Sequence, residues 1–268
     1  MKNKSALIGY TGFIGSNLIN FSRGLVKYNS KNIRSIKNKK FDTVICAGTS
    51  SKIWLSKKKP LQDLKQITNL INNLKKIEAK NFILISTSEV YGLKRTCFET
   101  TLNLKQKNSN YGLNRLMLEE FVEKNFENSF ILRLPIVYGK NFSKNCIYDL
   151  INKNEVHKLN GSDLIQIYNV KNQKEHIIFE KRKKINKLNL SSEPIRLDSL
   201  AKKFFKIKEN KKKKFRKINI KSIYGRNNGY FISKKKTMVD LSTFLKGIKI
   251  WSLVFLTWLG KKRNKKMF

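Results

Sequence analysis

The feature of this 268-residue sequence that most constrains its fold is a series of short, continuous apolar runs in its first half. Runs that do not alternate with polar residues indicate strands buried on both faces. The predicted strands cover 6–8, 41–48, 82–87 and 130–135, and the clearest helical patterns cover 60–79 and 110–125. Strands that alternate with helices predict an α/β fold with a doubly wound parallel sheet.

A glycine-rich loop, GYTGFIG (9–15), directly follows the first predicted strand and precedes a helical pattern. Gly9 permits a tight turn, Gly12 allows the backbone to approach a pyrophosphate, and Gly15 allows the helix to pack on the strand. The first turn of the helix then offers free N–H groups to phosphate oxygens. Turns that need positive φ also explain a glycine triplet, but in this context the loop predicts a Rossmann-type site for NAD or NADP.

The residues after the second predicted strand bear on the choice of cofactor. An NAD site usually has an acidic residue about 20 residues beyond the glycines, where it binds the adenosine ribose. The first acidic residue here is Asp42, at the head of the next core strand. Ser30 and Lys31 lie in the expected region and could accept a 2′-phosphate, which favours NADP. Lysine is abundant throughout the chain, which weakens this inference.

The formal net charge of +40 raises the alternative of a nucleic-acid or membrane-surface binder. Only ten of the 58 basic residues are arginine, whereas nucleic-acid readers tend to use the planar fork of arginine. The spread of lysine favours solvated faces, so a nucleic-acid partner is not expected. The segment 248–268 is apolar and then basic, and we expect it to contact a membrane surface, the core or a partner in a homodimer.

Cysteine and histidine are too sparse for several other classes of site. The three cysteines form no CxxC pair, and neither of the two histidines has a cysteine at metal-ligand spacing. We therefore expect no metal site and no disulfide scaffold. The first residues enter a strand-like run without a leader pattern, which predicts a cytoplasmic protein.

Five motifs in the first half of the chain resemble the extended short-chain dehydrogenase/reductases, the NAD(P)-dependent epimerase/dehydratase family that acts on nucleotide sugars. They are TGFIGSNL (11–18), FDTVICAG (41–48), ILISTSEVYG (83–92), YGLNRLMLEE (111–120) and ILRLPIVYG (131–139). Their layout is most similar to nucleotide-sugar reductases such as dTDP-4-dehydrorhamnose reductase. The resemblance implies an NAD(P)-dependent oxidoreductase or epimerase that transfers a hydride to or from a nucleotide sugar.

The resemblance also implies the catalytic residues. Thr87 takes the position of the family's Ser or Thr, Tyr111 that of its proton-transferring Tyr, and Arg115 that of its Lys. A tyrosine has an ordinary pKa near ~10, so it needs a cation nearby, here four residues on along one helix face, to exchange protons near neutrality. A guanidinium is longer and forked, so we expect cofactor binding with slow or narrowed turnover. A catalytically weak or inactive regulatory protein is the alternative.

Other family positions imply contacts with the cofactor. These are Thr11, Phe13 and Ile14 in the glycine loop, Cys46, Ala47 and Gly48 at the end of the strand 41–48, and Pro135 and Val137 beside the nicotinamide. Ser88 stands where the family's dehydratases have an Asp, which argues against dehydration.

The second half has weaker patterns. We expect a Rossmann domain over 1–140, completed by a strand and helix near 185–206, and a small, trimmed substrate lobe from 141–184 and 207–247. The pair Asn160-Gly161 predicts a hairpin, and the charged residues 171–184 predict a loop or sheet edge. A helix is predicted over 233–248, with Ser233 as its N-cap.

Overall fold

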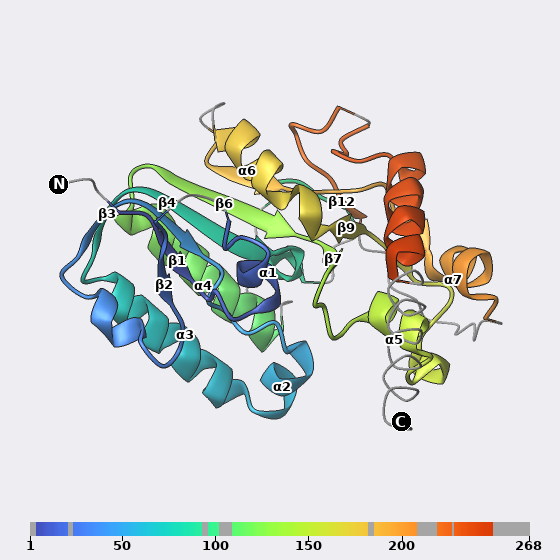
Figure 1. The fold of residues 1–268 in the computed structure, drawn as a ribbon, viewed down its shortest axis with the longest axis horizontal. Helices are drawn as coiled ribbons and strands as arrows, with labels where there is room; N and C mark the ends of the chain where they lie inside the picture. Colours follow the sequence, from blue (N-terminus) through green and yellow to red (C-terminus); the bar gives the residue numbers. More distant parts are fainter. Residues whose placement is uncertain are drawn as a thin grey trace, which may run out of the picture.

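The computed structural model describes residues 4–20, 24–92, 96–101, 109–181, 185–207, 219–226 and 228–248. Its central element is a six-stranded parallel sheet in the order β10–β6–β4–β3–β1–β2 (Figure 1). The strands are β1 (Ala6–Ile8), β2 (Val26–Tyr28), β3 (Lys40–Cys46), β4 (Glu78–Thr87), β6 (Ser129–Leu134) and β10 (Lys187–Asn189). Because β1 pairs with both β2 and β3, the strand order reverses beside β1, and ligands of such sheets bind at this point.

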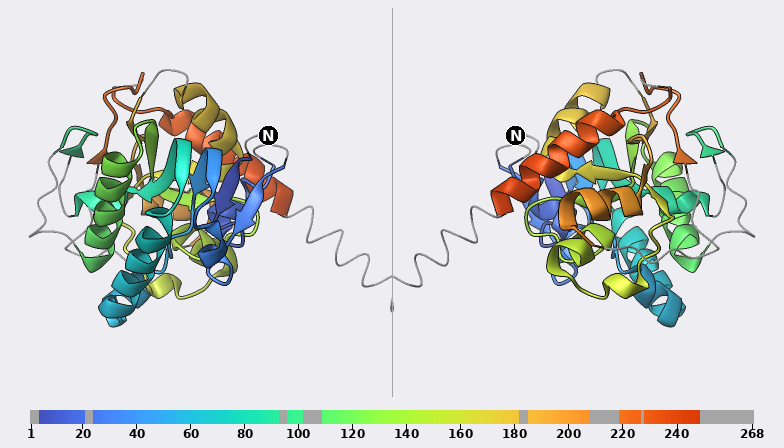
Figure 2. Two further views of the ribbon diagram at one scale, coloured as in Figure 1. Left: turned by 90° about the vertical axis from the view of Figure 1, so that its left-hand side faces the viewer. Right: turned by 90° about the vertical axis from the view of Figure 1, so that its right-hand side faces the viewer.

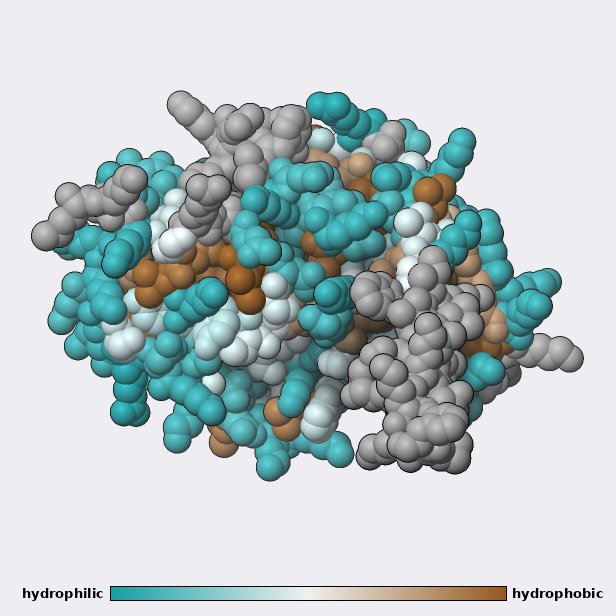
Figure 3. Space-filling model, viewed as in Figure 1, coloured by the Kyte–Doolittle hydropathy of each residue, from teal (hydrophilic) through white to brown (hydrophobic). Residues whose placement is uncertain are grey.

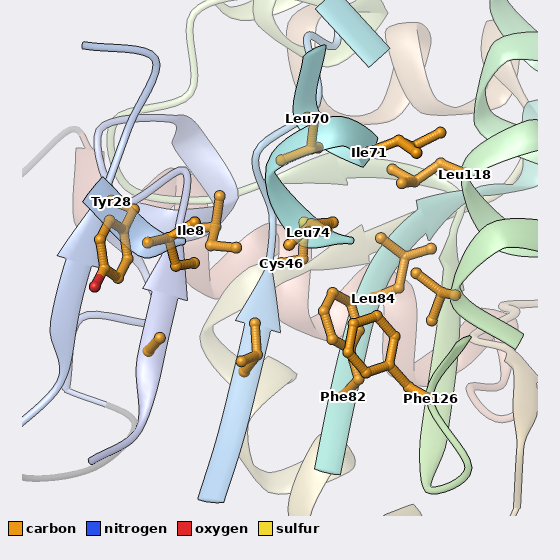
Figure 4. Packing of buried hydrophobic residues seen from close by; sticks show 14 of the residues in the cluster. Ile8, Tyr28, Cys46, Leu70, Ile71, Leu74, Phe82, Leu84, Leu118 and Phe126 are labelled. Carbon is orange, nitrogen blue, oxygen red and sulfur yellow. The ribbon is translucent and has the colours of Figure 1, made fainter. Parts of the chain in front are cut away.

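Helices cover both faces of the sheet (Figures 1 and 2). On one face lie α3 (Pro60–Leu74) and α4 (Asn110–Asn125), and on the other lie α1 (Phe13–Ser16) and α6 (Gln173–Lys181). Successive strand residues alternate between the two faces: Leu84 packs with Leu74 of α3, whereas Ile83 packs with Ile177 of α6. In the cluster that contains Leu84 and Leu74, the rings of Phe82 and Phe126 stack with their centres 4.3 Å apart (Figure 4). Burial on both faces explains why these strands read as unbroken apolar runs.

A smaller group of elements packs at the end of the sheet toward which the strands point (Figure 1). It contains α5 (Cys146–Asn152), α7 (Leu197–Phe205) and the helical residues 234–248. Its short strands form the pairs β7 (Ile136–Tyr138) with β9 (Ile167–Asn169) and β8 (Leu164–Ile165) with β11 (Ile195–Arg196). The side chains of these helices and strands share one apolar cluster that includes Tyr138, Leu200 and Leu241. The division into a domain over 1–140 and a lobe over 141–184 and 207–247 stays a prediction.

The remaining elements are short. They are α2 (Ile53–Lys58), the strands β5 (Thr96–Cys97) and β12 (Asn219–Ile220), and the 3-10 helices η1 (Ile33–Ile36), η2 (Ser88–Tyr91), η4 (Val156–Lys158) and η5 (Val170–Asn172). Only η1 lies between β2 and β3, so the connection between these two strands is unusually brief.

The predicted strands and the helix 110–125 are confirmed, and so is the cap on the last helix, where Ser233 Oγ accepts from Lys236 N at 3.2 Å. The helix predicted over 60–79 ends at Leu74, because the chain turns there and Glu78 already pairs with Lys40 as part of β4. The helix predicted over 233–248 is confirmed as well, since 234–248 are helical, whereas three other predictions need larger corrections.

The predicted hairpin at Asn160-Gly161 is wrong. The strand after this turn, β8, pairs antiparallel with β11 instead of with the preceding segment, which is 3-10 helical. The loop or edge predicted over 171–184 is wrong as well, since 173–181 form α6. Its Ile177 is fully buried in the apolar cluster that includes Ile83, and this apolar contact outweighs the charged composition around it.

The helix after the glycine loop is also shorter than predicted, because α1 has only four residues. Two side chains compete with the helical backbone pattern here: Ser16 Oγ and Asn17 Nδ2 both donate to the carbonyl of Phe13, at 2.9 and 2.8 Å. Ser and Asn side chains that bond nearby backbone groups weaken helices in this way. Leu18, just beyond this short helix, is buried in the core.

Hydrophilic residues cover most of the face seen in Figure 3, with smaller hydrophobic areas between them. This distribution matches the expectation of solvated lysine-rich faces. Within the described ranges, no helix combines the length and apolar character needed to span a bilayer. The membrane and dimer contacts predicted for 248–268 fall almost wholly on residues outside these ranges.

Candidate functional site

A cleft of about 760 Å³ opens where the parallel strands end. Its lining combines the glycine loop, the ends of β4 and β6, the start of α4, and the segments around α2 and α5. The sequence-predicted residues in the lining are Gly12, Phe13, Ile14, Ala47, Thr87, Tyr111, Arg115, Pro135 and Val137. The structure therefore brings the glycine loop and the Thr–Tyr–Arg set, distant in sequence, to one cavity.

The three glycines of the loop are required for different reasons. Gly9 has a positive φ of 84°, and a Cβ there would lie 2.3 Å from Ala47 O. A Cβ on Gly15 would lie 2.1 Å from Gly9 O, so helix and strand could not approach. A Cβ on Gly12 would meet Gly9 O at a less severe 3.3 Å, and Gly12 lines the cleft. Packing thus demands glycine at two positions, and at the third, Gly12, the cleft is lined without a side chain, as close approach by a ligand would require.

The predicted cofactor contacts at the end of β3, Cys46, Ala47 and Gly48, differ in whether they line the cleft. The Cys46 side chain is buried in the core beside Leu84 (Figure 4), and burial, offset by a hydrogen bond from the backbone of Gly48, raises the thiol pKa to about 11. Only the backbone of Cys46 could therefore face a ligand. Ala47 lines the cleft, and a Cβ on Gly48 would lie 2.8 Å from the side chain of Ile8.

Ser30 and Lys31 lie outside this cavity, in the turn that follows β2. The turn is joined to the glycine loop, since Gly9 N donates to Tyr28 O at 2.7 Å and Asn29 Nδ2 donates to Tyr10 OH at 3.2 Å. Asn29 Oδ1 in turn accepts from Lys31 N at 2.9 Å. Tyr10 and Asn29 are therefore further candidates beside the glycine loop, and the sequence motifs did not single them out. Thr11 is exposed in the loop itself.

Thr87 and Tyr111 reach the cleft from two different elements. Thr87 ends β4, and its Oγ1 accepts from Glu89 N at 3.2 Å, so its O–H remains available as a donor. Tyr111 lies in the first turn of α4, which Ser109 caps by accepting from Gly112 N at 3.2 Å. This cap fixes the start of the helix and thereby the position of Tyr111.

Arg115 is held away from solvent, with 2% of its side chain exposed. Its guanidinium donates to the carboxylate of Asp63, on α3, and to the carbonyl of Ser50. The guanidinium carbon lies 3.9 Å from the centre of the Tyr111 ring. The cation expected from the sequence is therefore next to Tyr111, but its charge is paired with an acid that the motifs did not identify.

Asp63 is the centre of a buried polar cluster. Besides Arg115, it accepts from Asn114 Nδ2 at 2.8 Å and from Ser56 Oγ at 3.1 Å. Burial favours the neutral acid, but the hydrogen bonds from Arg115 and Asn114 and the charge of Arg115 outweigh it and lower the pKa of Asp63. Asp63 is thus ionised at neutral pH and opposes the charge of Arg115.

The environment of Tyr111 keeps its hydroxyl protonated. Burial raises the pKa of Tyr111 above the ordinary value; the charge of Arg115 lowers it, while the charges of Glu89 and Asp63 raise it further. The net effect is upward. A protonated tyrosine at neutral pH is suited to donate a proton and poorly suited to remove one.

Comparisons with known proteins agree with this geometry. The model of the NAD dependent epimerase/dehydratase family matches residues 20–177, more than half of the chain. The chain belongs to the NAD-dependent epimerase/dehydratase family. No curated protein sequence matches it.

Solved structures of similar fold support the architecture of this family member. MoeE5, in complex with UDP-glucose and NAD, is 16% identical with a TM-score of 0.71 over 92% of this chain and 98% of its own. The dTDP-4-dehydrorhamnose reductase of Bacillus anthracis, in complex with NADP, is 17% identical with a TM-score of 0.61 over 91% and 93%. The UDP-glucuronic acid 4-epimerase of Bacillus cereus, with UDP-glucuronic acid and NAD, is 20% identical with a TM-score of 0.60 over 91% and 93%.

The glycine loop (9–15) lies entirely before the range 20–177 that the epimerase/dehydratase model matches, so its fit to a dinucleotide depends on the loop itself. The cleft beside Gly12 and the one-turn helix that follows suit a pyrophosphate, while Pro135 and Val137 supply an apolar wall. The residues present therefore fit NAD or NADP. Gly12, Phe13 and Ile14 would hold its phosphates.

A second buried ion pair joins α4 to β6. Arg133 of β6 donates through Nε to Glu119 Oε1 at 3.0 Å and through Nη1 to Tyr91 OH at 2.6 Å. Both charged side chains are essentially inaccessible to solvent. Since Glu119 lies eight residues beyond Tyr111 on the same helix, this pair helps to set the position of the helix relative to the strand ends.

Proposed function

We propose that this protein reduces a keto group on a nucleotide sugar with NADPH or NADH, and that Thr87 and Tyr111 are its catalytic residues. The observation that carries the proposal is the meeting of Thr87 and Tyr111 at one cleft, with the guanidinium carbon of Arg115 3.9 Å from the centre of the Tyr111 ring. Family membership and the cleft at the strand ends support the same activity. Several similar structures are named as nucleotide-sugar reductases or epimerases.

The chemistry assigned to each residue follows from its position. A reduced nicotinamide, when bound, supplies the hydride that forms the new C–H bond. Thr87 donates a hydrogen bond to the carbonyl oxygen of the sugar, which polarises it. As negative charge develops on that oxygen, the Tyr111 O–H bond breaks and its proton completes the new hydroxyl. Arg115, stacked on the ring, stabilises the tyrosinate until it takes a proton from solvent.

Epimerisation is the second candidate, because a UDP-glucuronic acid 4-epimerase shares the fold. Epimerisation through a keto intermediate begins with removal of a hydroxyl proton, and Tyr111 would have to act as a base in that step. Its raised pKa makes this first step the harder direction. We therefore propose reduction ahead of epimerisation.

For the cofactor, we propose NADP in preference to NAD. The stretch from residue 24 to residue 39 contains no acidic residue, and the Ser30–Lys31 turn is joined to the glycine loop through Asn29 and Tyr10. A 2′-phosphate would meet a cation there instead of a carboxylate. Titration of NADPH and NADH by the fluorescence of the reduced nicotinamide tests this, with Lys31→Ala expected to reduce only the NADPH affinity.

The decisive experiment measures loss of the reduced-nicotinamide absorbance with a panel of keto nucleotide sugars. We expect turnover by the wild type and a fall of about 10²–10⁴-fold in Tyr111→Phe, since that is the usual contribution of a general acid. Tyr148→Phe is the matched control, because Tyr148 lines the same cleft but has no assigned role. Equal rates in the wild type and Tyr111→Phe, or cofactor binding without turnover of any sugar nucleotide, would contradict the proposal.

Arg115→Lys addresses the alternative of a weakened enzyme. A lysine could still approach Asp63 but could not also donate to Ser50 O and stack flat on the ring of Tyr111. If the arginine limits turnover, the rate rises in Arg115→Lys while the NADPH affinity is kept. A lower rate in this variant would show that the site is built around the guanidinium.

A further inference from the structure

The lining of the cleft carries lysines outside the glycine loop. Lys57 lies on α2 and Lys144 on the loop between β7 and α5, and both line the cavity. Lys52, just before α2, is close enough to Lys144 for its charge to affect that ammonium. These three residues are called the lysine wall below.

The lysine wall lacks a compensating charge within the described part of the chain. No ion pair joins Lys52, Lys57 or Lys144 to a described carboxylate, and two of the acids that line the cavity have other partners. Glu155 pairs with Lys158, and Asp149 accepts from Asn154 Nδ2 at 3.2 Å. Burial, and then the charges of Lys52 and Arg115, lower the pKa of the half-buried Lys144 to about 8. An anion placed here would relieve that repulsion.

An aromatic surface adjoins the lysine wall. Trp54 lines the cleft from α2, three residues before Lys57, and 56% of its side chain is exposed. It is the largest exposed apolar side chain on the cavity. Exposed tryptophan rings provide stacking surfaces for bases, and the cations beside this one suit phosphates.

We propose that the lysine wall and Trp54 form the subsite for the nucleoside diphosphate of the substrate, with Lys57 and Lys144 on the diphosphate and Trp54 stacked on the base. This assignment rests on the proposed function, since it supplies the binding site for the nucleotide part of that substrate. The sugar then lies toward Thr87 and Tyr111, which line the same cavity. Nothing in the motifs of the first half indicated either Lys144 or Trp54.

The experiment measures binding of UDP and dTDP by calorimetry at low salt, in the presence of saturating NADPH, and so requires no turnover. We expect Lys144→Ala and Lys57→Ala each to weaken diphosphate binding about tenfold, as loss of one charge-assisted contact does. Lys65→Ala, on the exposed face of α3, is the matched control and leaves binding unchanged. Lys144→Arg retains most of the affinity.

Trp54 gives an independent optical readout. UDP quenches tryptophan fluorescence in the wild type, and the quench is lost in Trp54→Leu, which controls for the other two tryptophans. Inorganic pyrophosphate competes with UDP without causing the quench, and uridine binds more weakly than UDP. The Trp54→Leu variant binds pyrophosphate as the wild type does but loses affinity for UDP.

Three results would overturn the assignment. They are UDP affinity that is the same in Lys144→Ala as in Lys65→Ala, competition between UDP and NADPH, and a fluorescence quench that survives in Trp54→Leu. Failure of the proposed function looks different, because the protein would then bind UDP through these residues but oxidise no NADPH with any keto sugar.

Discussion

Replacing Asp63 by Asn tests the pairing of Arg115 most directly. The change keeps the size of the side chain and two of its neighbours, Asn114 and Ser56, but leaves the guanidinium of Arg115 buried without a carboxylate. Removing one partner of a buried ion pair costs about 3–5 kcal/mol of unfolding free energy. For a chain of this size each kcal/mol shifts the melting temperature by about 2–4 °C, so we expect a decrease of roughly 10 °C.

The matched control is Asp42→Asn. Asp42 pairs with Lys80 at 3.2 Å, but both side chains are well exposed, and such pairs contribute about 0–1 kcal/mol. Thermal unfolding followed by circular dichroism compares the two variants. The pKa of Asp63 is lowered in the folded protein, so the pair stabilises above the ordinary carboxyl pKa, and this contribution is lost as pH falls through the folded value. The difference between the variants should therefore shrink in acid.

The Asp63→Asn variant also tests whether Asp63 acts on Tyr111 electrostatically or only stabilises the fold. In reduction Tyr111 acts while protonated, so activity falls as pH rises through its pKa. Asp63 raises that pKa and Arg115 lowers it, so Asp63→Asn leaves the guanidinium unopposed and lowers it. Because Asp63 offsets the charge of Arg115, its removal should move the alkaline limb of the rate profile to lower pH. An alkaline limb of the rate profile that stays in place would refute this reasoning.

Two further predictions concern other parts of the cleft. Gly9→Ala should destabilise the fold, because its Cβ would lie 2.3 Å from Ala47 O at a positive φ. Gly12→Ala should fold normally but lose cofactor affinity. Melting curves and NADPH titration distinguish the two variants, and equal melting temperatures would contradict the assignment. UDP affinity should fall as pH rises through about 8, where Lys144 loses its proton, and the fall should be absent in Lys144→Arg; calorimetry across this range measures it.

The apolar runs predicted the sheet because burial on both faces leaves an unmistakable sequence pattern, as at Phe82–Ile85. The glycine spacing and the Tyr–Arg pair likewise predicted residues that do meet at one cleft. The end of α3 and the course of α6 were mispredicted because tertiary contacts, such as those of Ile177, determine them.

Asp63 could not have been found by motif. It lies on a helix with an apolar stripe, and only the packing of α3 against α4 shows that it faces Arg115. A charged residue within such a stripe, four positions before Ile67, is a signal for a buried partner, but the sequence does not name that partner. No sequence pattern singled out Lys144 or Trp54 either, because lysine is common throughout the chain and a single exposed tryptophan fits many surfaces.

A cation at this site could serve two tasks, acting on the charge of Tyr111 and contacting a ligand in the cleft. The guanidinium of Arg115 lies over the ring of Tyr111, so its charge can act on the tyrosine, while only 2% of its side chain is exposed and its terminal nitrogens already donate to Asp63 and to Ser50 O. Lys144 is half-buried, lines the cleft and is affected by the charge of Arg115. If ligand contact has passed to Lys144, its loss raises KM for the nucleotide sugar and leaves kcat nearly unchanged. Loss of Arg115 lowers kcat, and this opposite pattern in the two variants decides whether the tasks are divided.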